Sequence, residues 1–239
     1  MPSPKPPAFT TYKTFILASE RFSVGDTVAV RSPGSVKDYI AAIERIHTDK
    51  DAEVMIDCRW YYRPEETAMG RQPWNGEDEL IDSDHVDTFH VRCVNSRCKI
   101  LTMADYEAYW AGGHKVDTQV PVYFCRSKYL KKLGKLEKPL PTYCACKQPQ
   151  KPEASLIQCD KCDKWYFGKC IGLTSMDAGS LSSWMCPLCT PEDENGKRKE
   201  RTDDLLDKVR RGECSPWDHP FSPVAGKPKF SKKRRKNKT

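Results

Sequence analysis

Seven cysteines between residues 144 and 189 constrain this chain more than any other feature of its sequence. Two pairs have two residues between the cysteines, one pair has a single residue, and one cysteine stands apart. Such close spacing lets one tight turn bind a metal ion through two thiolates, and tetrahedral zinc needs four ligands of this kind. The segment is too short to bury a sufficient apolar core, so we expect bound metal to supply much of its folding free energy. The cysteines are Cys144, Cys146, Cys159, Cys162, Cys170, Cys186 and Cys189.

The alternatives to metal binding are disulfides and unrelated buried thiols. The N-terminal stretch MPSPKPPAFT lacks the apolar segment of a secretory signal, and no run of about 18 apolar residues predicts a membrane span. We therefore expect an intracellular protein, in which thiols stay reduced and the chain's 12 cysteines point to metal. Seven unrelated thiols at this density and spacing are the less favoured explanation.

Upstream of these cysteines, residues 10–135 alternate apolar and polar positions in short runs that turn signals separate. This period of two is typical of strands, so we predict a mostly β domain with a twisted, barrel-like sheet. One short helix is predicted at 103–113, where Gly112 and Gly113 end it. The predicted strands lie at 22–33, 38–47 and 52–64, at two places within 78–103 around an Asn-Ser turn, and at 120–130.

The other segments are predicted from composition. Residues 1–9 form a Pro-rich disordered lead, 136–140 a linker and 141–192 the compact cysteine-rich unit. Residues 193–239 form a disordered tail with one short helical pattern at 201–212. The end of the tail carries eight basic residues and no acid, and subtracting them from the net charge of +7 leaves −1 for the rest. Such a run fits nuclear import first and non-specific DNA contact second, because phosphate contacts carry no sequence information. The basic residues are Lys227, Lys229, Lys232, Lys233, Arg234, Arg235, Lys236 and Lys238.

The cysteine-rich unit resembles a plant homeodomain (PHD) finger, whose ligand order is four cysteines, one histidine and three cysteines. Trp184 stands two residues before the last cysteine pair, as in that family, and Trp165 also matches. The resemblance implies a cross-brace in which alternate ligand pairs share a zinc ion. One zinc would be held by Cys159, Cys162, Cys186 and Cys189, and the other by Cys144, Cys146, Cys170 and the residue at 167, which here is Phe167.

Phe167 has no lone pair to offer a metal, so the resemblance implies one complete zinc site and one incomplete site. No histidine lies within 141–192. His219 would have to close a long loop, and a water ligand belongs to catalytic zinc sites, which this family lacks. We expect Phe167 to weaken the second site, or to pack as an apolar plug. The chain's histidines are His47, His85, His90, His114 and His219.

Residues 10–135 resemble a bromo-adjacent homology (BAH) domain through VGDTVAVRSP, DYIAAIERI, VMIDCRWYYRPEET, ELIDSDHVD and CKIL. The stretch CRWYYRPEE is the most specific of these. With the finger directly behind it, the chain is similar to the plant BAH–PHD family of histone readers over nearly its whole length apart from the tail. That resemblance implies a nuclear, non-enzymatic protein that binds methylated histone H3 tails in nucleosomes and regulates transcription by recruiting repressive chromatin complexes.

Aromatic residues in the BAH-like part suit a methylated lysine. In a strand, Trp60 and Tyr62 point to one face and Tyr61 to the other. Ring faces attract a trimethylammonium group, which keeps its charge but has lost its N–H donors. Ordinary strand packing explains the same aromatics, and periodicity alone favours it. The resemblance reverses this preference and implies a cage of Tyr39, Trp60 and Tyr62 for H3 trimethylated at lysine 27, with His85 and Asp87 along the peptide backbone.

The finger has fewer aromatic and acidic residues at the histone-binding positions that the family implies. One cage tyrosine of the related plant proteins is matched by Gln150. The acidic residues that could meet the histone N-terminus are reduced to Glu153 and Asp160. We therefore expect weakened binding of H3 methylated at lysine 4. The remaining cage positions that the family implies are Tyr143, Leu156 and Trp165.

Several alternatives stay open. Cross-braced cysteines also describe a RING-type ubiquitin ligase, although Trp184 favours the finger, and the finger could be purely structural. No phosphate loop, nucleophile elbow or carboxylate pair indicates an enzyme. A third metal site could form from His85, His90, Cys93 and Cys98, but strand alternation would send some of them to opposite faces. Isolated thiols are expected at Cys58, Cys125 and Cys214, the first two in the core.

Overall fold

The computed structural model describes residues 10–34, 37–113, 120–152, 154–173, 181–190 and 211. The predicted lead, nearly all of the helical pattern at 201–212 and the basic run lie outside these residues. Among the described residues, no helix is long and apolar enough to cross a membrane. The chain divides into two compact units: a larger one of residues 1–72, 77–106 and 115–139, and a smaller one of residues 73–76, 107–114 and 140–239.

The larger unit is built on a nine-stranded sheet. Its main path runs β11-β10-β7-β6-β5-β4-β8, with β1 on β5 and β9 on β10, and β10 is parallel to both β7 and β9. The strands are β1 (Thr11–Tyr12), β4 (Thr27–Val30), β5 (Tyr39–Thr48), β6 (Val54–Tyr62), β7 (Glu79–His90), β8 (Val94–Arg97), β9 (Lys99–Thr102), β10 (Val122–Leu130) and β11 (Lys135–Leu136). A separate hairpin consists of β2 (Thr14–Leu17) and β3 (Glu20–Ser23).

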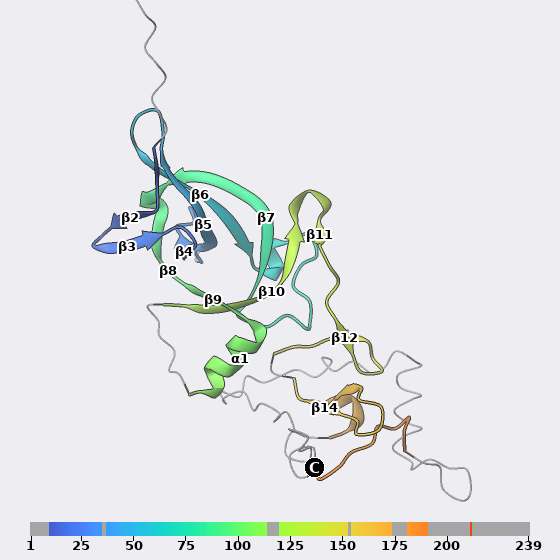
Figure 1. Ribbon diagram of the computed structural model, residues 1–239. Helices are drawn as coiled ribbons and strands as arrows, with labels where there is room; N and C mark the ends of the chain where they lie inside the picture. The colour runs from blue at the N-terminus through green and yellow to red at the C-terminus, as the bar shows by residue number, and fades with distance from the viewer. Residues whose placement is uncertain are drawn as a thin grey trace, which may run out of the picture. The chain divides into compact units, whose positions relative to one another are not determined.

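The sheet curls into a barrel because one short segment is bonded to both of its sides. β8 pairs with β4, β9 pairs with β10, and only Cys98 separates β8 from β9. The Cys98 N–H donates to the Thr27 carbonyl at 3.0 Å, and the Cys98 carbonyl accepts from the Thr27 hydroxyl at 2.7 Å. Figure 1 shows the long strands of this sheet bent around a common interior. The prediction of a mostly β, barrel-like domain is confirmed.

Short helical elements connect the strands, and here the sequence-based expectation was partly wrong. The predicted helix is α1 (Met103–Ala111), and single 3-10 turns form η1 (Pro64–Glu66), η2 (Val91–Cys93) and η3 (Lys131–Leu133). The stretch 78–103 contains three strands rather than two, and its expected Asn-Ser turn lies inside β8. The chain turns at η2 instead, where His90 Nδ1 accepts from the Arg92 N–H at 3.0 Å, a cap that no turn residue signals.

The hairpin of β2 and β3 was not predicted at all. Its connecting residues, Ala18 and Ser19, both have positive φ, at 47° and 68°. Glycine and asparagine are the usual residues for such backbone angles, so the sequence carries no turn signal there.

Apolar side chains of the larger unit form two clusters. Along β6 successive residues pack with different clusters, Trp60 with the first and Tyr61 with the second, as strand alternation predicts. Cys58 is fully buried in the first, as expected for a core thiol. The first cluster comprises Phe15, Phe22, Val28, Val30, Ala41, Ile43, Ile46, Ile56, Cys58, Val91 and Val94, and the second Ala29, Ile40, Leu80 and Cys98.

The smaller unit has little regular structure. Its described residues form two short hairpins, one turn of 3-10 helix and the end of α1, residues 107–111. Its tight loops place non-glycine residues at positive φ, namely Cys144 (62°), Lys147 (53°) and Asp163 (58°), beside the cysteine pairs. Gly168 is required by space, since a Cβ there would lie 2.6 Å from the Leu173 carbonyl oxygen. The elements are β12 (Thr142–Tyr143), β13 (Gln148–Pro149), β14 (Leu156–Gln158), β15 (Trp165–Phe167) and η4 (Gly168–Ile171).

A buried ion pair ties β7 to β10. Arg126 Nε lies 2.8 Å from Glu79 Oε1 and its Nη2 lies 3.2 Å from Oε2, so the pair is bidentate. Glu79 is only 1% exposed. Removing the guanidinium would take away the positive charge that faces a carboxylate shielded from water.

We predict that Arg126→Met lowers the free energy of unfolding by about 3–5 kcal/mol, as expected when one partner of a buried pair is lost. The matched control is Arg71→Met, because the Arg71–Glu65 pair at 2.8 Å is solvent-accessible and should contribute only about 0–1 kcal/mol. Urea denaturation of both variants gives the comparison. Equal stability of the two variants would show that the buried pair does not hold β7 to β10.

Candidate functional site

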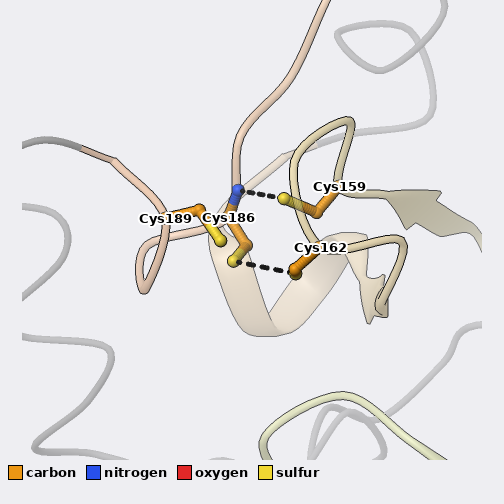
Figure 2. Close-up of side chains that lie close together, drawn as sticks. All are labelled: Cys159, Cys162, Cys186 and Cys189. Carbon is orange, nitrogen blue, oxygen red and sulfur yellow. Dashed lines mark hydrogen bonds between the residues drawn. The ribbon is translucent and has the colours of Figure 1, made fainter.

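Four cysteines of the smaller unit converge on one point. The sulfurs of Cys159, Cys162, Cys186 and Cys189 all lie within 4.8 Å of one another. Figure 2 shows the first two on the turn after β14 and the other two on a separate segment, all pointing inward. The two segments are held together by main-chain bonds, among them the Asp160 N–H donating to the Trp184 carbonyl at 2.9 Å.

The chemistry of these four donors fits zinc. The Cys186 N–H donates to the Cys159 sulfur at 3.2 Å, which stabilises a thiolate. Burial alone would raise the pKa of Cys159, but backbone N–H donors, including that of Cys186, outweigh it and lower the pKa to about 6. Tyr166 and Trp184 pack beside the cysteines. Their two rings meet edge to face, with centroids 5.5 Å apart. Four protein sulfurs, which fill all four positions of a tetrahedral ion, are typical of a structural zinc site.

A second group in the same unit has only three sulfurs. Those of Cys144, Cys146 and Cys170 also lie within 4.8 Å of one another. In the described part of the chain, no fourth Cys, His, Asp or Glu joins them. Hydrogen bonds from the thiols of Cys146 and Cys170 lower the pKa of Cys144, and the pKa of Cys146 is raised in return.

Phe167 is part of the apolar core beside these three sulfurs. It is 1% exposed and clusters with Leu156 and Cys170. Its backbone contributes to the lowered pKa of Cys144, while its side chain brings only carbon atoms to the group. The three thiols therefore fit a metal ion only in part, because the residues that the structure describes supply no fourth ligand atom there.

The finger's expected histone-binding residues lie around this same core. Tyr143 and Trp165 pack against the cluster of Leu156, Phe167 and Cys170. Asp160 Oδ2 accepts from the Trp184 N–H at 2.7 Å, so this carboxylate also holds the second cysteine segment in place. Glu153 lies outside the described residues.

In the larger unit, aromatic rings gather where β5, β6 and β7 lie side by side. Tyr39 and Trp60 meet edge to face with centroids 5.8 Å apart, and Tyr39 is 41% exposed. Trp60 lies 6.4 Å from the His85 ring, which stacks on Tyr62 at 6.1 Å with an interplanar angle of 9°. Phe89, which sequence reasoning missed, stacks on Trp60 at 5.4 Å. The sequence-predicted residues are thus brought together into one open aromatic group.

Hydrogen bonds fix the orientation of these rings. Trp60 Nε1 donates to Asp87 Oδ2 at 2.8 Å, and the same oxygen lies 3.1 Å from His85 Nε2. The Tyr62 hydroxyl lies 2.7 Å from His85 Nδ1. Burial raises the pKa of Tyr62, and the negative charge of Asp87 adds to this, so the phenol remains neutral at physiological pH. Asp87 therefore holds two rings in place and puts a negative charge beside them.

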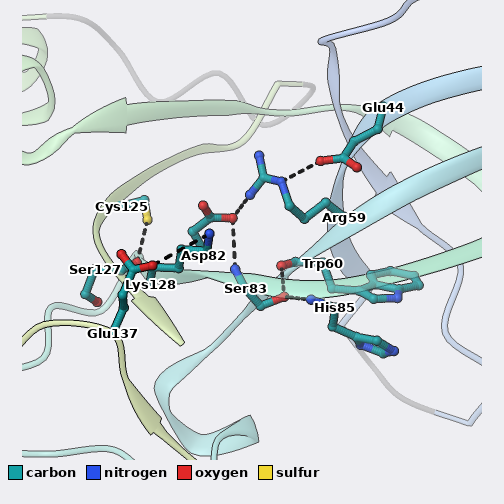
Figure 3. A network of polar contacts seen from close by, with 10 residues as sticks. All are labelled: Glu44, Arg59, Trp60, Asp82, Ser83, His85, Cys125, Ser127, Lys128 and Glu137. Atoms are coloured by element: carbon teal, nitrogen blue, oxygen red, sulfur yellow. Dashed lines mark hydrogen bonds and ion pairs between the residues drawn. The ribbon is translucent and has the colours of Figure 1, made fainter. Parts of the chain in front are cut away.

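Ser83 is a positioning residue that the sequence does not reveal. The β6–β7 ladder shifts register between Arg59 and Tyr61, so Trp60 has no partner in it. The buried Ser83 hydroxyl donates to the Trp60 carbonyl at 2.7 Å and accepts from the His85 N–H at 3.1 Å, as Figure 3 shows. A register shift of this kind re-aims a side chain out of the regular ladder.

A lysine lies at the edge of the aromatic group. Lys131 Nζ is 2.8 Å from His85 Nε2 and 3.1 Å from His85 Nδ1, and the Lys131 N–H donates to Asp84 Oδ1 at 2.8 Å. Sequence reasoning missed this residue because it follows β10, far along the chain from the other members.

The hypothesis of a third metal site is wrong. His90 Nε2 lies 2.9 Å from Glu53, while Cys98 is buried in the second apolar cluster. The four residues proposed for it form no metal-type group in the described part of the chain. Cys125 is an isolated thiol whose pKa is raised by burial, and Cys214 lies outside the described residues.

Comparison with known proteins agrees with this geometry. Residues 20–140 match the model of the BAH domain and residues 144–189 that of the PHD-finger. The chain is 33% identical to "Chromatin remodeling protein EBS" of Arabidopsis thaliana over 193 residues, covering 78% of this chain and 79% of that protein.

A second relative and one solved structure are also similar to this chain. The chain is 31% identical to "Chromatin remodeling protein SHL" of Arabidopsis thaliana over 195 residues, 80% of this chain and 82% of that protein. The crystal structure of the yeast Rsc2 BAH domain aligns with a TM-score of 0.43 and 17% identity, over 54% of this chain and 55% of that chain. From the two domain matches and the two relatives, which align over about four fifths of their length, the chain belongs to the BAH–PHD family of chromatin remodeling proteins.

Proposed function

We propose that this protein is a nuclear, non-enzymatic reader of histone H3 in nucleosomes. Its BAH domain binds the tail trimethylated at lysine 27, and its PHD finger binds the tail methylated at lysine 4 more weakly. By holding repressive complexes at such nucleosomes it lowers transcription. The observation that carries the proposal is the group formed by Tyr39, Trp60, Tyr62 and His85, with Asp87 beside it.

The chemistry of that group suits a quaternary ammonium ion. A trimethylated lysine cannot donate a hydrogen bond but keeps its charge, so ring faces attract it by about 0.5–2 kcal/mol per good contact. The carboxylate of Asp87, whose side chain is 53% exposed, adds an attractive charge. Tyr39 is accessible enough to meet a ligand. His85 and Asp87 would also meet the peptide backbone on either side of the lysine.

The finger offers less to a methylated lysine. Gln150 stands at the position that the family resemblance matches to a cage tyrosine. Leu156 belongs to the apolar cluster around Phe167, and Tyr143 and Trp165 pack against it. The three-cysteine group beside this cluster has no fourth metal ligand among the described residues. This packing supports weakened lysine-4 binding, and it equally supports a second candidate in which the finger is only a structural module beside a BAH reader.

A RING-type ubiquitin ligase is the competing enzymatic function. The match of residues 144–189 to the PHD-finger model speaks against it. Incubation with a panel of ubiquitin-conjugating enzymes tests this directly, and formation of ubiquitin chains would favour the ligase.

We predict that Trp60→Ala weakens binding of a lysine-27-trimethylated H3 peptide by about 1–3 kcal/mol and removes discrimination against the unmodified peptide, because it deletes a ring wall. Tyr61→Ala is the matched control: Tyr61 packs with the second cluster, so the change should lower stability and leave methyl discrimination intact. Isothermal titration measures both, with circular dichroism as the folding check. A folded Trp60→Ala protein that binds like the parent would exclude the cage.

The two modules can be ranked by a third variant. Trp165→Ala should leave affinity for the lysine-27 peptide unchanged and reduce binding of the lysine-4-trimethylated peptide, since Trp165 belongs to the finger. If the parent protein prefers the lysine-4 peptide in the same titrations, the ranking of BAH over finger is reversed.

For the metal, we predict that the purified protein holds one zinc ion tightly and clearly fewer than two after mild chelation. Phe167→His should raise the content towards two and stabilise the finger, because a histidine nitrogen completes four-coordination. Elemental analysis with thermal denaturation measures both effects. Two tightly held zinc ions in the unmutated protein would contradict the assignment of Phe167.

For localisation, we predict that deleting residues 227–239 shifts the protein out of the nucleus while BAH peptide binding is retained. These residues hold all eight basic residues of the acid-free end of the chain. The test is microscopy of a fusion too large to diffuse through nuclear pores. Unchanged nuclear accumulation of the truncated fusion would show that another signal directs import.

A further inference from the structure

The three-sulfur group of Cys144, Cys146 and Cys170 has the composition of a different kind of metal site. Its sulfurs lie within 4.8 Å of one another, close enough to bind a single ion. Cys170 is buried, and the other two cysteines are half-buried. The site is separate from the complete four-cysteine set, which shares none of its members.

Within the described ranges of the chain, a zinc ion at this group would find three thiols and no fourth protein ligand. Zinc in structural sites takes four ligands, so the fourth would have to be water. Phe167, 1% exposed and packed with Leu156, lines this group with carbon atoms. A buried water needs about two to four polar partners, and an aromatic ring offers it no lone pair.

Soft ions that are satisfied by three thiolates have no such requirement. Trivalent arsenic and monovalent copper both form stable three-coordinate thiolate complexes, and soft sulfur ligands select such ions. With arsenous acid, three thiols form three As–S bonds and release three molecules of water, with no change in oxidation state. The resulting arsenic trithiolate is electrically neutral, so burying it beside Phe167 costs less than burying a charged zinc or copper complex.

We infer that Cys144, Cys146 and Cys170 form a three-coordinate site that prefers a soft thiophilic ion to zinc, with Phe167 excluding the fourth ligand. The complete four-cysteine site keeps its zinc, so the finger can stay folded while the second site takes a different ion. The inference goes beyond histone reading and does not depend on it.

The test is a titration of the full-length, zinc-loaded, reduced protein with sodium arsenite under anaerobic conditions. Sulfur-to-arsenic charge-transfer absorption reports binding, and elemental analysis after desalting counts arsenic and zinc. We expect one arsenic and one retained zinc per chain. A parallel titration with monovalent copper, buffered by a copper(I) chelator, shows which of the two soft ions binds more tightly.

Variants separate this site from other thiols. Phe167→His should weaken arsenite binding at least tenfold relative to zinc, because it restores a four-coordinate zinc site. Cys170→Ser should remove arsenite binding, whereas Cys93→Ser, which changes a partly exposed thiol of the larger unit, should leave it unchanged.

X-ray absorption at the arsenic edge of the unmutated protein gives a readout that no folding defect of a variant can affect. We expect three sulfur atoms in the first shell. Two sulfurs and one oxygen, equal arsenite binding by Cys170→Ser, or two zinc ions that arsenite does not displace would each overturn the inference.

Discussion

The barrel depends on how a single residue, Cys98, is held against Thr27. The Cys98 N–H donates to the Thr27 carbonyl at 3.0 Å, and the Thr27 hydroxyl donates to the Cys98 carbonyl at 2.7 Å. These two bonds help to keep β8 on β4 while β9 runs on to β10. Because the same short segment is bonded to both sides, the sheet must curl. Within this sheet β6 pairs with both β5 and β7, so rings on one face of the three strands lie side by side as an aromatic group.

Within that group, position and charge come from residues that are not themselves aromatic. The Ser83 hydroxyl donates to the Trp60 carbonyl at the register shift between β6 and β7. The Asp87 carboxylate interacts with the ring nitrogens of both Trp60 and His85. Rings held by such bonds lose little further freedom when a ligand enters, which favours affinity. The ammonium of Lys131, 2.8 Å from His85, adds a positive charge at the edge of the group.

The finger is organised by sulfur in a different way. Its short strands and single 3-10 turn bury few side chains, so the two cysteine groups lie at the centre of what core there is. In one group, four thiols converge with backbone N–H donors aimed at sulfur. In the other, the phenyl group of Phe167 packs as the apolar plug that was one of the two expectations for this position. At this second group the described residues offer three sulfur ligands rather than four.

The sequence by itself determined the class of each unit. The spacing of the cysteines predicts metal sites, because two thiolates on one tight turn can bind the same ion. The alternation of apolar and polar residues predicts strands, with Trp60 and Tyr61 on opposite faces. It did not predict the hairpin at Ala18 and Ser19 or the turn at η2, because both depend on backbone angles and caps that lack a turn signal. Only the tertiary structure brought Ser83, Phe89 and Lys131 to the aromatic group, since contacts between residues distant in the chain arise from strand register and sheet curvature, which local pattern does not encode.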